Sequence, residues 1–348
     1  MNPPPAAPPS ITVSRATATD WPALAQFYAH QFSARPRLND ADLWRWMFLQ
    51  QPAEARPVPF FVLKVDGRIE GAIGYLQFEL RVGDANLAAI HPVNYFVNPR
   101  YKGLPALRLF RAILQEGRIV IGSYVSDDAH RLLGKSGFID FGAHVHGYHL
   151  GLTITPRTPL RSAVIFAGRR LWEAALRGYT ATRYRSLSYR LDSELNDAWL
   201  AIAGTWSPPG VGIRKTAEYL RWRYALSPVL NCRYLWQFEH GVPVGLAIVH
   251  FEPREHAAVL LDVSAATFAA DRCTGLILQI IRHARAHALD LFTTHCMSPA
   301  IEAILRRIGC GRVPSDLGFM VYSPDTAGKI ILADAKHWHF MIGDTDRY

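Results

Sequence analysis

The spacing of apolar residues near the start of the chain predicts an amphipathic helix. Trp21, Leu24, Phe27 and Tyr28 recur at the interval that places side chains on one helix face. Pro22 suits the first turn of such a helix. Backbone N–H groups in that turn have no hydrogen-bond partner within the helix, so a proline, which lacks the N–H group, breaks no bond there. We therefore expect a helix that packs one apolar face against the rest of the fold.

Longer apolar runs predict buried strands, and each is followed by helical spacing. Residues 88–99 and 257–265 form such runs, and the helical patterns follow at 104–115 and 273–288. Shorter strands and helices follow in the same order after each pattern. Strands that are interrupted by helices in this way are typical of a mixed sheet covered by helices on both faces.

The order of elements occurs twice, and short motifs mark the repetition. LWRWMFLQQP in the first half corresponds to LRWRYALSP in the second, and two hairpin turns follow them, at Asp66-Gly67 and His240-Gly241. The period is near 174 residues, which is the separation of Gly71 and Gly245. Further landmarks keep nearly the same spacing: Trp46, Pro52 and Gly137 in the first half, and Trp222, Pro228 and Gly309 in the second. Chance explains such spacing poorly, so we expect two copies of one unit.

The predicted fold class is therefore mixed α/β, of the α+β kind, with two tandem domains. Each domain is expected to hold a mixed, mostly antiparallel sheet flanked by helices. Residues 1–10 are Pro-rich and are expected to be a disordered tail, followed by a first domain at 11–152. Residues 153–185 are expected to form a basic helical linker, and 186–348 a second domain.

Composition narrows the class of partner. The chain has 348 residues, 49% of them hydrophobic, and a formal charge of +9, so anionic partners are favoured. The basic residues are spread out, which disfavours DNA. The four cysteines are singly spaced, so neither a zinc site nor a disulfide framework is expected. The N-terminus lacks the pattern of a signal peptide and no apolar run is long enough to span a membrane, so a cytoplasmic location is expected.

The stretch NPRYKGLPAL, which joins the first long strand to the next helix, carries a family resemblance. Pro99, Tyr101, Lys102 and Gly103 resemble the first part of the turn with which the GNAT superfamily of N-acyltransferases holds the pyrophosphate of coenzyme A. The resemblance covers about residues 11–150, and a fainter second copy covers about 185–348. It implies an acetyl-CoA or other acyl-CoA donor, bound at the N-terminus of a helix that attracts anions. The cofactor-binding residues that it implies are Phe96, Val97, Lys102, Gly103, Leu104, Ala106 and Ser126.

The chain also departs from the family pattern. Pro105 and Leu107 replace two loop glycines, and Pro105 has no N–H group to donate. Leu133 stands where the family often has a tyrosine that protonates the leaving thiolate, and Leu305 stands there in the second copy. The second copy keeps only Gly275 of the loop glycines, so we expect the first copy to bind coenzyme A.

The ending KHWHFMIGDTDRY resembles the C-terminus of tandem GNAT-like proteins found with exopolysaccharide and surface-glycan genes. Trp338, Gly343, Asp344 and Asp346 match. The resemblance implies an amine acceptor on an amino sugar or nucleotide sugar, with Asp344 in the acceptor pocket. The alternative interpretation is a C-terminal turn in which the Asp344 side chain binds its own backbone.

Acyl transfer to an amine needs a base, a donor for the oxyanion and a proton source for the thiolate. The candidate bases on the first long strand are His91 and, through a water molecule, Tyr95. Asn94 is a candidate for substrate binding, although it faces the other way from these two unless a bulge intervenes. In the second copy, Asp262 interrupts an apolar strand, and a buried carboxylate needs a partner. The alternative for His91 is an ordinary strand residue, and for Asp262 a loop cap.

Two further segments allow alternative interpretations. His144 and His146 are expected to share a strand face, where a surface strand is a simpler interpretation than a metal site. The basic linker at 153–185 has apolar residues that can line one helix face. It either packs between the domains or makes a peripheral contact with a membrane.

The leading functional hypothesis is an acyl-CoA-dependent N-acyltransferase for a surface-polysaccharide amine. A Fem-type aminoacyltransferase that uses aminoacyl-tRNA is the second, because such enzymes also carry two GNAT-like copies and lack a coenzyme A loop. A non-catalytic binding protein that kept the fold is the third.

Overall fold

The structure is a computed structural model that describes residues 8–33, 40–52, 58–123, 127–153, 186–206, 210–315 and 317–345, with scattered positions between 164 and 182. The chain divides into two compact units. Unit 1 comprises residues 1–78 and 88–121, and unit 2 comprises 79–87 and 122–348.

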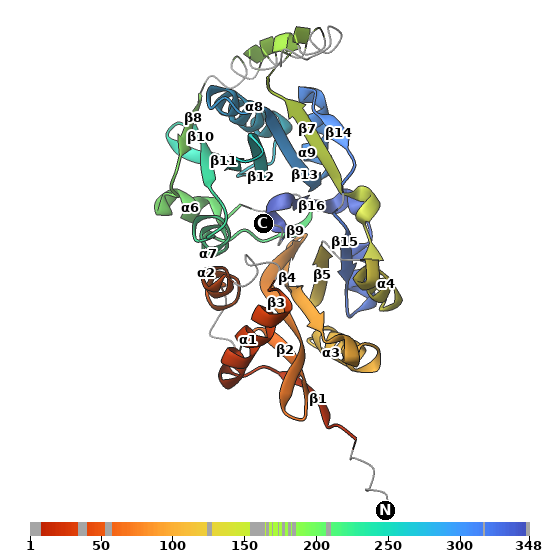
Figure 1. Cartoon of the computed structure of the whole chain (residues 1–348). Coiled ribbons are helices and arrows are strands. Elements are labelled where there is room, and N and C mark those ends of the chain that lie inside the picture. The colour runs from red at the N-terminus through yellow and green to blue at the C-terminus, as the bar shows by residue number, and fades with distance from the viewer. Residues whose placement is uncertain are drawn as a thin grey trace, which may run out of the picture. The chain divides into compact units, whose positions relative to one another are not determined.

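Unit 1 is built on a sheet with the order β1-β2-β3-β4-β5 (Figure 1). Its strands are β1 (Ile11–Arg15), β2 (Phe60–Val65), β3 (Arg68–Val82), β4 (Ala85–Val97) and β5 (Ile119–Ser123), of which the middle of the β3–β4 hairpin and the end of β5 belong to unit 2. Strands β1, β2 and β3 are antiparallel, whereas β4 and β5 are parallel. The turn between β2 and β3 has φ of 47° at Asp66 and 80° at Gly67, as a tight hairpin requires.

The helices of unit 1 follow the predicted order. A short 3-10 turn (Ala18–Asp20), in which Thr17 and Asp20 cap each other, leads into α1 (Trp21–Gln31). Next come α2 (Ala41–Trp44), which the side chain of Asp40 caps, and a π-helical turn (Arg45–Leu49). A second 3-10 turn (Pro99–Tyr101) follows β4, and α3 (Leu104–Leu114) precedes β5. Leu24, Phe27 and Tyr28 of α1 are buried, as their spacing predicts.

The remaining strands belong to unit 2, and most of them form one mixed sheet. From one edge, the order is β8 (Leu187–Asp192), β10 (Cys232–Glu239), β11 (Val242–Glu252), β12 (Ala257–Ala265), β13 (Leu291–Met297), β16 (Trp338–Met341) and β9 (Val211–Ile213). The tip of β3 pairs with β9. The order is antiparallel from β8 to β12, and β12 and β13 are parallel. The shorter strands are β6 (Ile139–Asp140), β7 (His146–Gly151), β14 (Gly311–Val313) and β15 (Phe319–Tyr322).

Helices cover both faces of this sheet. The helices are α4 (Asp127–Lys135), α6 (Asp197–Ala203), α7 (Ala217–Leu220), α8 (Ala270–Ala286), α9 (Pro299–Ile308) and α10 (Thr326–Leu332). A π-helical turn (Arg221–Ala225) extends α7, and 3-10 turns occur at Gly142–His144, Ala335–His337 and Ile342–Asp344. Leu235 packs in the cluster that contains α8 and α9, whereas its neighbours Tyr234 and Trp236 pack in the cluster with α6 and α7. The alternation of strand side chains thus supplies two cores, and the predicted α/β fold class is confirmed.

The landmarks of the sequence repeat have the same local structure in both halves. The two Trp motifs each form a short α-helix followed by a π-helical turn, at Arg45–Leu49 and Arg221–Ala225. Both hairpin turns have positive φ, and so have Gly137 and Gly309. π-helical turns are rare and occur often near functional sites. The tandem arrangement as such stays a prediction.

Strands of the predicted first and second domains pair with one another inside unit 2. Strand β7, which lies in the predicted first domain, runs antiparallel to β13 from Gly151 to His146 and also pairs with β14 (Figure 1). Likewise, β15 of the predicted second domain pairs with β6. The compact units therefore do not coincide with the predicted boundary near residue 152.

One local prediction is wrong, and others lie outside the described residues. His144 belongs to a 3-10 turn that ends before β7 begins, so it does not share a strand face with His146. Residues 1–7, most of the 153–185 linker and Ser126 are not among the described residues. No helix in the described ranges combines the length and apolarity needed to cross a membrane.

Candidate functional site

Strand β4 of unit 1 has an unusual backbone conformation at Asn94. Asn94 has φ of 53°, in the left-handed region that side chains rarely adopt within a strand. The hydroxyl of Tyr28 in α1 donates to the carbonyl of Asn94. A left-handed residue interrupts the regular two-residue alternation of a strand, so the facing rule does not fix the direction of the Asn94 side chain. The role of Asn94 in substrate binding stays a prediction.

The turn after β4 is anchored to β3. The side chain of Asn98 accepts from the N–H of Arg100 at 3.1 Å and donates to the Glu70 carboxylate at 2.8 Å. The N–H of Asn98 donates to the Glu70 carbonyl at 2.8 Å. These bonds fix the direction in which the chain leaves the sheet toward α3.

The start of α3 can hold an anion. Gly103, the N-cap, has φ of 92° and ψ of −129°, a conformation that only glycine adopts without strain. Lys102, Gly103 and Leu104 are exposed, and Leu104 retains 58% of its accessible surface. The N–H groups of the first turn have no acceptor within a helix, and the dipole adds positive charge there. Pro105 lies in this turn and removes one donor, as predicted.

Tyr95 and His91, the predicted bases, are both held within β4. The hydroxyl of Tyr95 donates to the carbonyl of Ala106 at 2.9 Å, and burial raises the pKa of Tyr95 to about 12. The contact ties the strand to the first turn of α3 and keeps the hydroxyl protonated at neutral pH. His91 is buried, with 2% of its surface exposed. The roles of both residues in catalysis stay predictions.

Phe96 and Val97 are the predicted cofactor residues of β4. Phe96 contacts other aromatic rings, and Val97 packs closely against β3. The Phe96 ring lies 5.9 Å from that of Phe27 and 6.1 Å from that of Phe32. Val97 approaches Gly71 of β3 so closely that a Cβ there would lie 3.0 Å from Val97 Cγ2. Gly71, a landmark of the sequence repeat, is therefore needed for packing.

In unit 2, a bulge in β12 turns Asp262 toward α7. Leu260 pairs with Val249 and Asp262 with Ile248, so Leu261 is the extra residue. Leu261 belongs to the core beside α7, and the bulge gives Asp262 the same direction. Without the bulge, the alternation of side chains along β12 would place Asp262 on the same face as Leu260, which packs against α8. The bulge therefore explains how an acid within an apolar strand reaches a polar partner.

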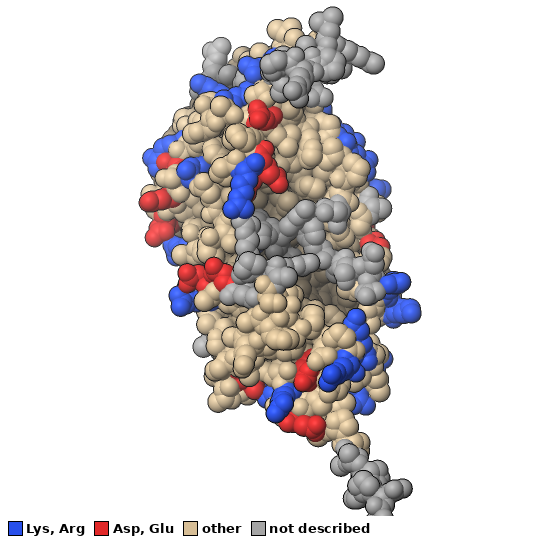
Figure 2. Space-filling model, viewed as in Figure 1, with Lys and Arg blue, Asp and Glu red and all other residues tan. Residues whose placement is uncertain are grey.

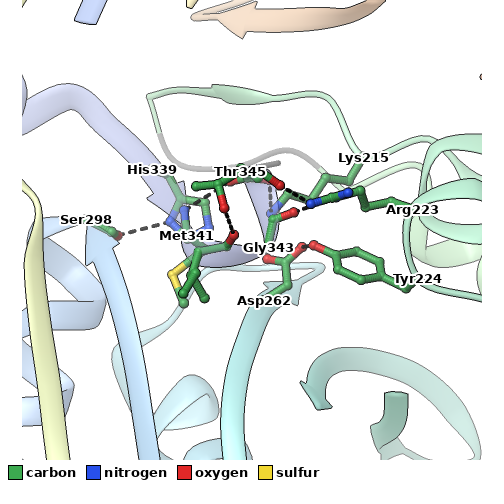
Figure 3. A network of polar contacts seen from close by, with 11 residues as sticks. Lys215, Arg223, Tyr224, Asp262, Ser298, His339, Met341, Gly343 and Thr345 are labelled. Carbon is green, nitrogen blue, oxygen red and sulfur yellow. Dashed lines mark hydrogen bonds and ion pairs between the residues drawn. The ribbon is translucent and has the colours of Figure 1, made fainter. Parts of the chain in front are cut away.

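Asp262 belongs to a buried polar network that contains two carboxylates (Figure 3). The ammonium of Lys215 lies 2.5 Å from Asp262 Oδ1 and 3.4 Å from Asp344 Oδ1. The hydroxyl of Tyr224 donates to Asp262 Oδ2 at 3.0 Å. The residues predicted for catalysis and for acceptor binding in this half, Asp262 and Asp344, thus share one cation.

The same network holds the C-terminal segment against the sheet. Arg223 donates from Nε to the carbonyl of Gly343 at 2.8 Å and from Nη2 to that of Thr345. The carboxylate of Asp344 accepts from the N–H of Met341 at 3.0 Å, which caps the last turn. A Cβ on Gly343 would lie 2.6 Å from the carbonyl oxygen of Leu261, so only glycine allows this contact with β12.

Burial and charge shift the pKa values of this network. Burial alone would lower the pKa of Lys215, but the charges of Asp262 and Asp344 outweigh it and the pKa is raised. Burial raises the pKa of Asp344 to about 6, against the attraction of Lys215. A single ammonium beside two carboxylates favours a proton on one of them. The pKa of Asp344 thus lies closer to neutral pH than that of an exposed aspartate.

His339 and a small cavity complete the surroundings of Lys215. The ring of His339 lies 3.0 Å from the Ser298 hydroxyl, and burial together with the charge of Lys215 lowers its pKa to about 4. A cavity of about 10 Å³ touches Lys215, His339, Trp206 and Phe268. That volume holds about one water molecule. The predicted roles of Asp262 and Asp344 stay predictions.

The sequence pattern did not single out Lys215, Arg223 or Tyr224. A signal was present, because the repeated motif reads RWMF in the first half and RWRY in the second. Met47 and Phe48 thus correspond to Arg223 and Tyr224, and both members of each pair are buried. A charged side chain at a position that is apolar in the other copy indicates a buried polar partner.

Metal binding has no geometric support in the described residues. Their His, Cys, Asp and Glu side chains do not gather in a group of three or more that could ligate an ion. On the face drawn in Figure 2, blue and red side chains are interspersed among uncharged surface.

Comparison with solved structures decides the fold. A GCN5-related N-acetyltransferase from Anabaena variabilis matches 90% of this chain and 72% of its own, with a TM-score of 0.58 and 13% identity. The chain has the fold of the GCN5-related N-acetyltransferases. A probable N-acyltransferase from Enterococcus faecalis matches the same shares at a TM-score of 0.59 and 8% identity.

A third match comes from a fungal enzyme. The glucosamine N-acetyltransferase region of a multi-domain GH3 β-N-acetylglucosaminidase matches 91% of this chain and 38% of its own, at a TM-score of 0.53 and 12% identity. No protein-family model and no curated protein matches the sequence. The N-acetyltransferase fold that the NPRYKG turn predicted is confirmed.

Proposed function

We propose that the chain is an acyl-CoA-dependent N-acyltransferase whose donor binds to unit 1. The observation that carries the proposal is the start of α3, where the left-handed Gly103 and the exposed Lys102 follow strand β4. A helix N-terminus with a lysine beside it suits a pyrophosphate. Pro105 removes one N–H donor from this anion-binding site but leaves the other donors of the first turn in place.

The helix that follows the long strand of unit 2 suits an anion less well. Asp271 lies in the first turn of α8, where its carboxylate already complements the dipole and repels a phosphate. The N-cap is Ala269, with an ordinary φ of −89°. The C-terminal segment also occupies the side of β12 beside its bulge. These features support a donor site in unit 1 only.

The end of β4 supplies the place for chemistry in this proposal. The thioester carbonyl lies against the strand near Tyr95 to Val97, where a backbone N–H group meets the developing oxyanion. His91 or a water molecule near Tyr95 takes the proton of the amine. The proposed binding set remains Phe96, Val97, Lys102, Gly103, Leu104, Ala106 and Ser126, of which Ser126 lies outside the described residues.

The proposed acceptor is the amine of an amino sugar or nucleotide sugar used for surface polysaccharide. The support is the GDTD ending and the similarity in fold to the fungal glucosamine N-acetyltransferase region. The proposed location is the cytoplasm, where the free thiols of the four buried cysteines would stay reduced.

Calorimetric titration with acetyl-CoA tests the donor site. We expect the wild-type protein to bind and Lys102→Glu to lose at least tenfold in affinity, because the new carboxylate repels the pyrophosphate. Arg108→Glu is the matched control, since Arg108 is an exposed residue of α3 about one turn after the helix start and the charge change is identical. Equal losses in both variants would show a general effect of charge, and unchanged binding by Lys102→Glu would overturn the proposed site.

A failure of acetyl-CoA to bind would favour the other hypotheses. Retention of aminoacyl-tRNA on a filter, weakening with salt, would support the Fem-type alternative. Acyl-CoA hydrolysis or transfer by the protein would exclude a non-catalytic binding protein.

We also propose a peripheral membrane contact through the 153–185 segment. Among its described residues, Val164 and Leu171 expose 67% and 74% of their surface. Trp172 instead donates to the carbonyl of Arg307 at 2.6 Å, which supports packing on unit 2. Sedimentation with anionic vesicles tests the contact: Leu171→Glu should reduce it, whereas Ile330→Glu, an equally exposed site in α10, should not.

A further inference from the structure

The outward face of α3 in unit 1 carries exposed basic side chains. Arg108 and Arg111 lie three residues apart on this face, on the side of the helix opposite the buried Ile113. Two more exposed basic residues, Arg100 and Lys102, lie in the turn that leads into the helix. Together these four residues form a basic stripe along the helix and its entry.

The charge of this segment is one-sided. Residues 85–115 contain the four basic residues of the stripe and no acidic residue. None of the four forms an ion pair within the described part of the chain. By contrast, Arg15 of the same unit pairs with Glu116 at 2.5 Å, and Lys64 pairs with Asp20 at 2.6 Å. The stripe therefore presents positive charge that its own unit leaves uncompensated.

This arrangement is unfavourable for the helix by itself. Like charges three residues apart on a helix repel each other, and basic residues ahead of a helix oppose its dipole. The first turn of α3 holds no acidic residue to offset this effect, whereas the first turn of α8 holds Asp271. An anionic surface placed over the stripe would relieve the repulsion.

The exposed Leu104 indicates which kind of anionic surface fits. It lies four residues before Arg108 on the same helix face and exposes 58% of its surface. An apolar side chain with charged neighbours is typical of a protein interface, which has an apolar centre and a polar rim. Single-stranded nucleic acid is instead bound by exposed aromatic rings that stack on its bases, and Tyr101 of the entry turn is half-buried. The stripe therefore suits an acidic protein.

We propose that the basic stripe docks an acidic carrier protein, which delivers an acyl thioester on a phosphopantetheine arm. The inference rests on the proposed function and adds a second source of the acyl group for the same site. The arm of a carrier holds a single phosphate, whereas coenzyme A holds a pyrophosphate at the corresponding place. The first turn of α3, from which Pro105 removes one N–H donor, suits the single phosphate because fewer donors are needed.

The transfer from a carrier is the same reaction as the transfer from coenzyme A. The amine nitrogen of the acceptor forms an amide bond with the carbonyl carbon of the thioester, and the C–S bond breaks. The sulfur stays on the arm as a thiolate and takes up the proton that the amine releases. The stripe touches none of the reacting atoms. It attracts the carrier by charge and orients it so that the phosphate of the arm reaches the start of α3.

The experiment measures the binding of acetyl-CoA, of uncharged tRNA and of a type II acyl carrier protein with an acetyl thioester on its arm. We expect the wild-type protein to bind the acetylated carrier, and more weakly as the salt concentration rises. Arg111→Glu should lower the affinity for the carrier by about tenfold and leave the affinity for acetyl-CoA unchanged. Arg45→Glu is the matched control, because Arg45 is an exposed arginine of unit 1 outside the stripe. Its affinity for the carrier should equal that of the wild-type protein.

The outcomes separate the inference from the function on which it rests. Binding of acetyl-CoA without binding of the carrier, or carrier binding that Arg111→Glu leaves unchanged, would overturn the docking surface and leave the donor site standing. Binding of tRNA in place of the carrier, weakened by Arg111→Glu, would overturn the acidic protein as the partner. No binding of either acetyl-CoA or the carrier would overturn both proposals. If Arg111→Glu does not give the wild-type circular dichroism spectrum, Arg108→Glu replaces it, and the same results decide.

Discussion

At the scale of single residues, the stability of unit 2 depends on the buried charges around Lys215. Its side chain is 5% exposed and lies between two carboxylates that are themselves buried. Taking three charges out of water costs several kcal/mol for each ion, and their mutual attraction offsets that cost only while all of them are present. The network therefore stabilises the fold as a unit.

Replacing Lys215 with methionine should destabilise the protein by about 3–5 kcal/mol, because two carboxylates are left without their cation. Arg214→Met is the control, since the neighbouring Arg214 forms an exposed ion pair with Glu79 that is worth about 0–1 kcal/mol. Urea unfolding at pH 7 measures both. Similar losses in the two variants would contradict a buried network.

The pKa values of Asp344 and His339 predict opposing dependences of stability on pH. The pKa of Asp344 is raised to about 6 by folding, so its proton binds more tightly in the folded state and stability falls as pH rises toward 6. The pKa of His339 is lowered to about 4, so its contribution is present above about 6.5 and is lost as pH falls toward 4. In the wild-type protein the two effects largely cancel between pH 4 and 6.

Single variants should reveal the two contributions. Asp344→Asn should leave a protein whose stability rises with pH between 4 and 6.5, by up to about 3 kcal/mol. His339→Gln should leave one whose stability falls over the same range. Thermal unfolding at a series of pH values measures both slopes, and parallel slopes in the two variants would refute the assignment.

Residue-level sequence reasoning found one side of this network and missed the other. An aspartate within an apolar strand, such as Asp262, is visible in a single sequence because buried charge is rare. Its partner is not visible, since Lys215 lies in a loop where lysines are ordinary. A bulge decides the direction of the carboxylate, and the sequence of β12 does not show where the ladder slips.

At the scale of elements, the junction of β4 and α3 rests on the conformation of one glycine. Gly103 has φ of 92° and ψ of −129°. Gly103→Ala should cost about 1–3 kcal/mol through backbone strain alone, because a Cβ there would meet no atom within 4 Å.

The same change elsewhere supplies the control for this prediction. Gly134 lies within α4 and does not have a positive φ. A Cβ added at Gly134 would also meet no atom within 4 Å. Gly134→Ala should therefore stabilise the protein by about 0.5–1 kcal/mol. Chemical unfolding distinguishes the two signs, and a neutral Gly103→Ala would argue against the strained cap.

Elements were predicted well because their patterns are local. The helix of Trp21 and the strand at 257–265 appear where their periodicity placed them, since side-chain burial enforces the period. The π-helical turns at Arg45–Leu49 and Arg221–Ala225 were not predicted, because one extra residue in a helical turn leaves the apolar spacing almost unchanged.

At the scale of the whole chain, the exchange of strands makes the two predicted domains interdependent. Strand β7 pairs with both β13 and β14, and it lies before the predicted boundary at residue 152. Residues 153–348 made alone should therefore fail to unfold cooperatively, because β13 loses an edge partner and the core loses Tyr148 and Leu150.

Co-production of residues 1–152 and 153–348 should restore a cooperative thermal transition. Calorimetry of the separate and combined fragments measures this, with the intact chain as control. A cooperative transition in residues 153–348 alone would show that β7 is dispensable. Sequence reasoning could not anticipate the pairing of β7 with β13 and β14, because both predicted copies offer similar strands and the sequence repeat does not specify which strands pair.

The position of β7 also has a consequence for synthesis on the ribosome. A nascent chain displays β7 well before its partners, since about 160 residues separate it from the end of β14. At about 5–20 residues per second, the strand waits roughly 8–30 s with its edges unpaired. An unpaired strand of this kind is a site for aggregation and for chaperone binding. The pace of translation is therefore a determinant of the yield of native protein.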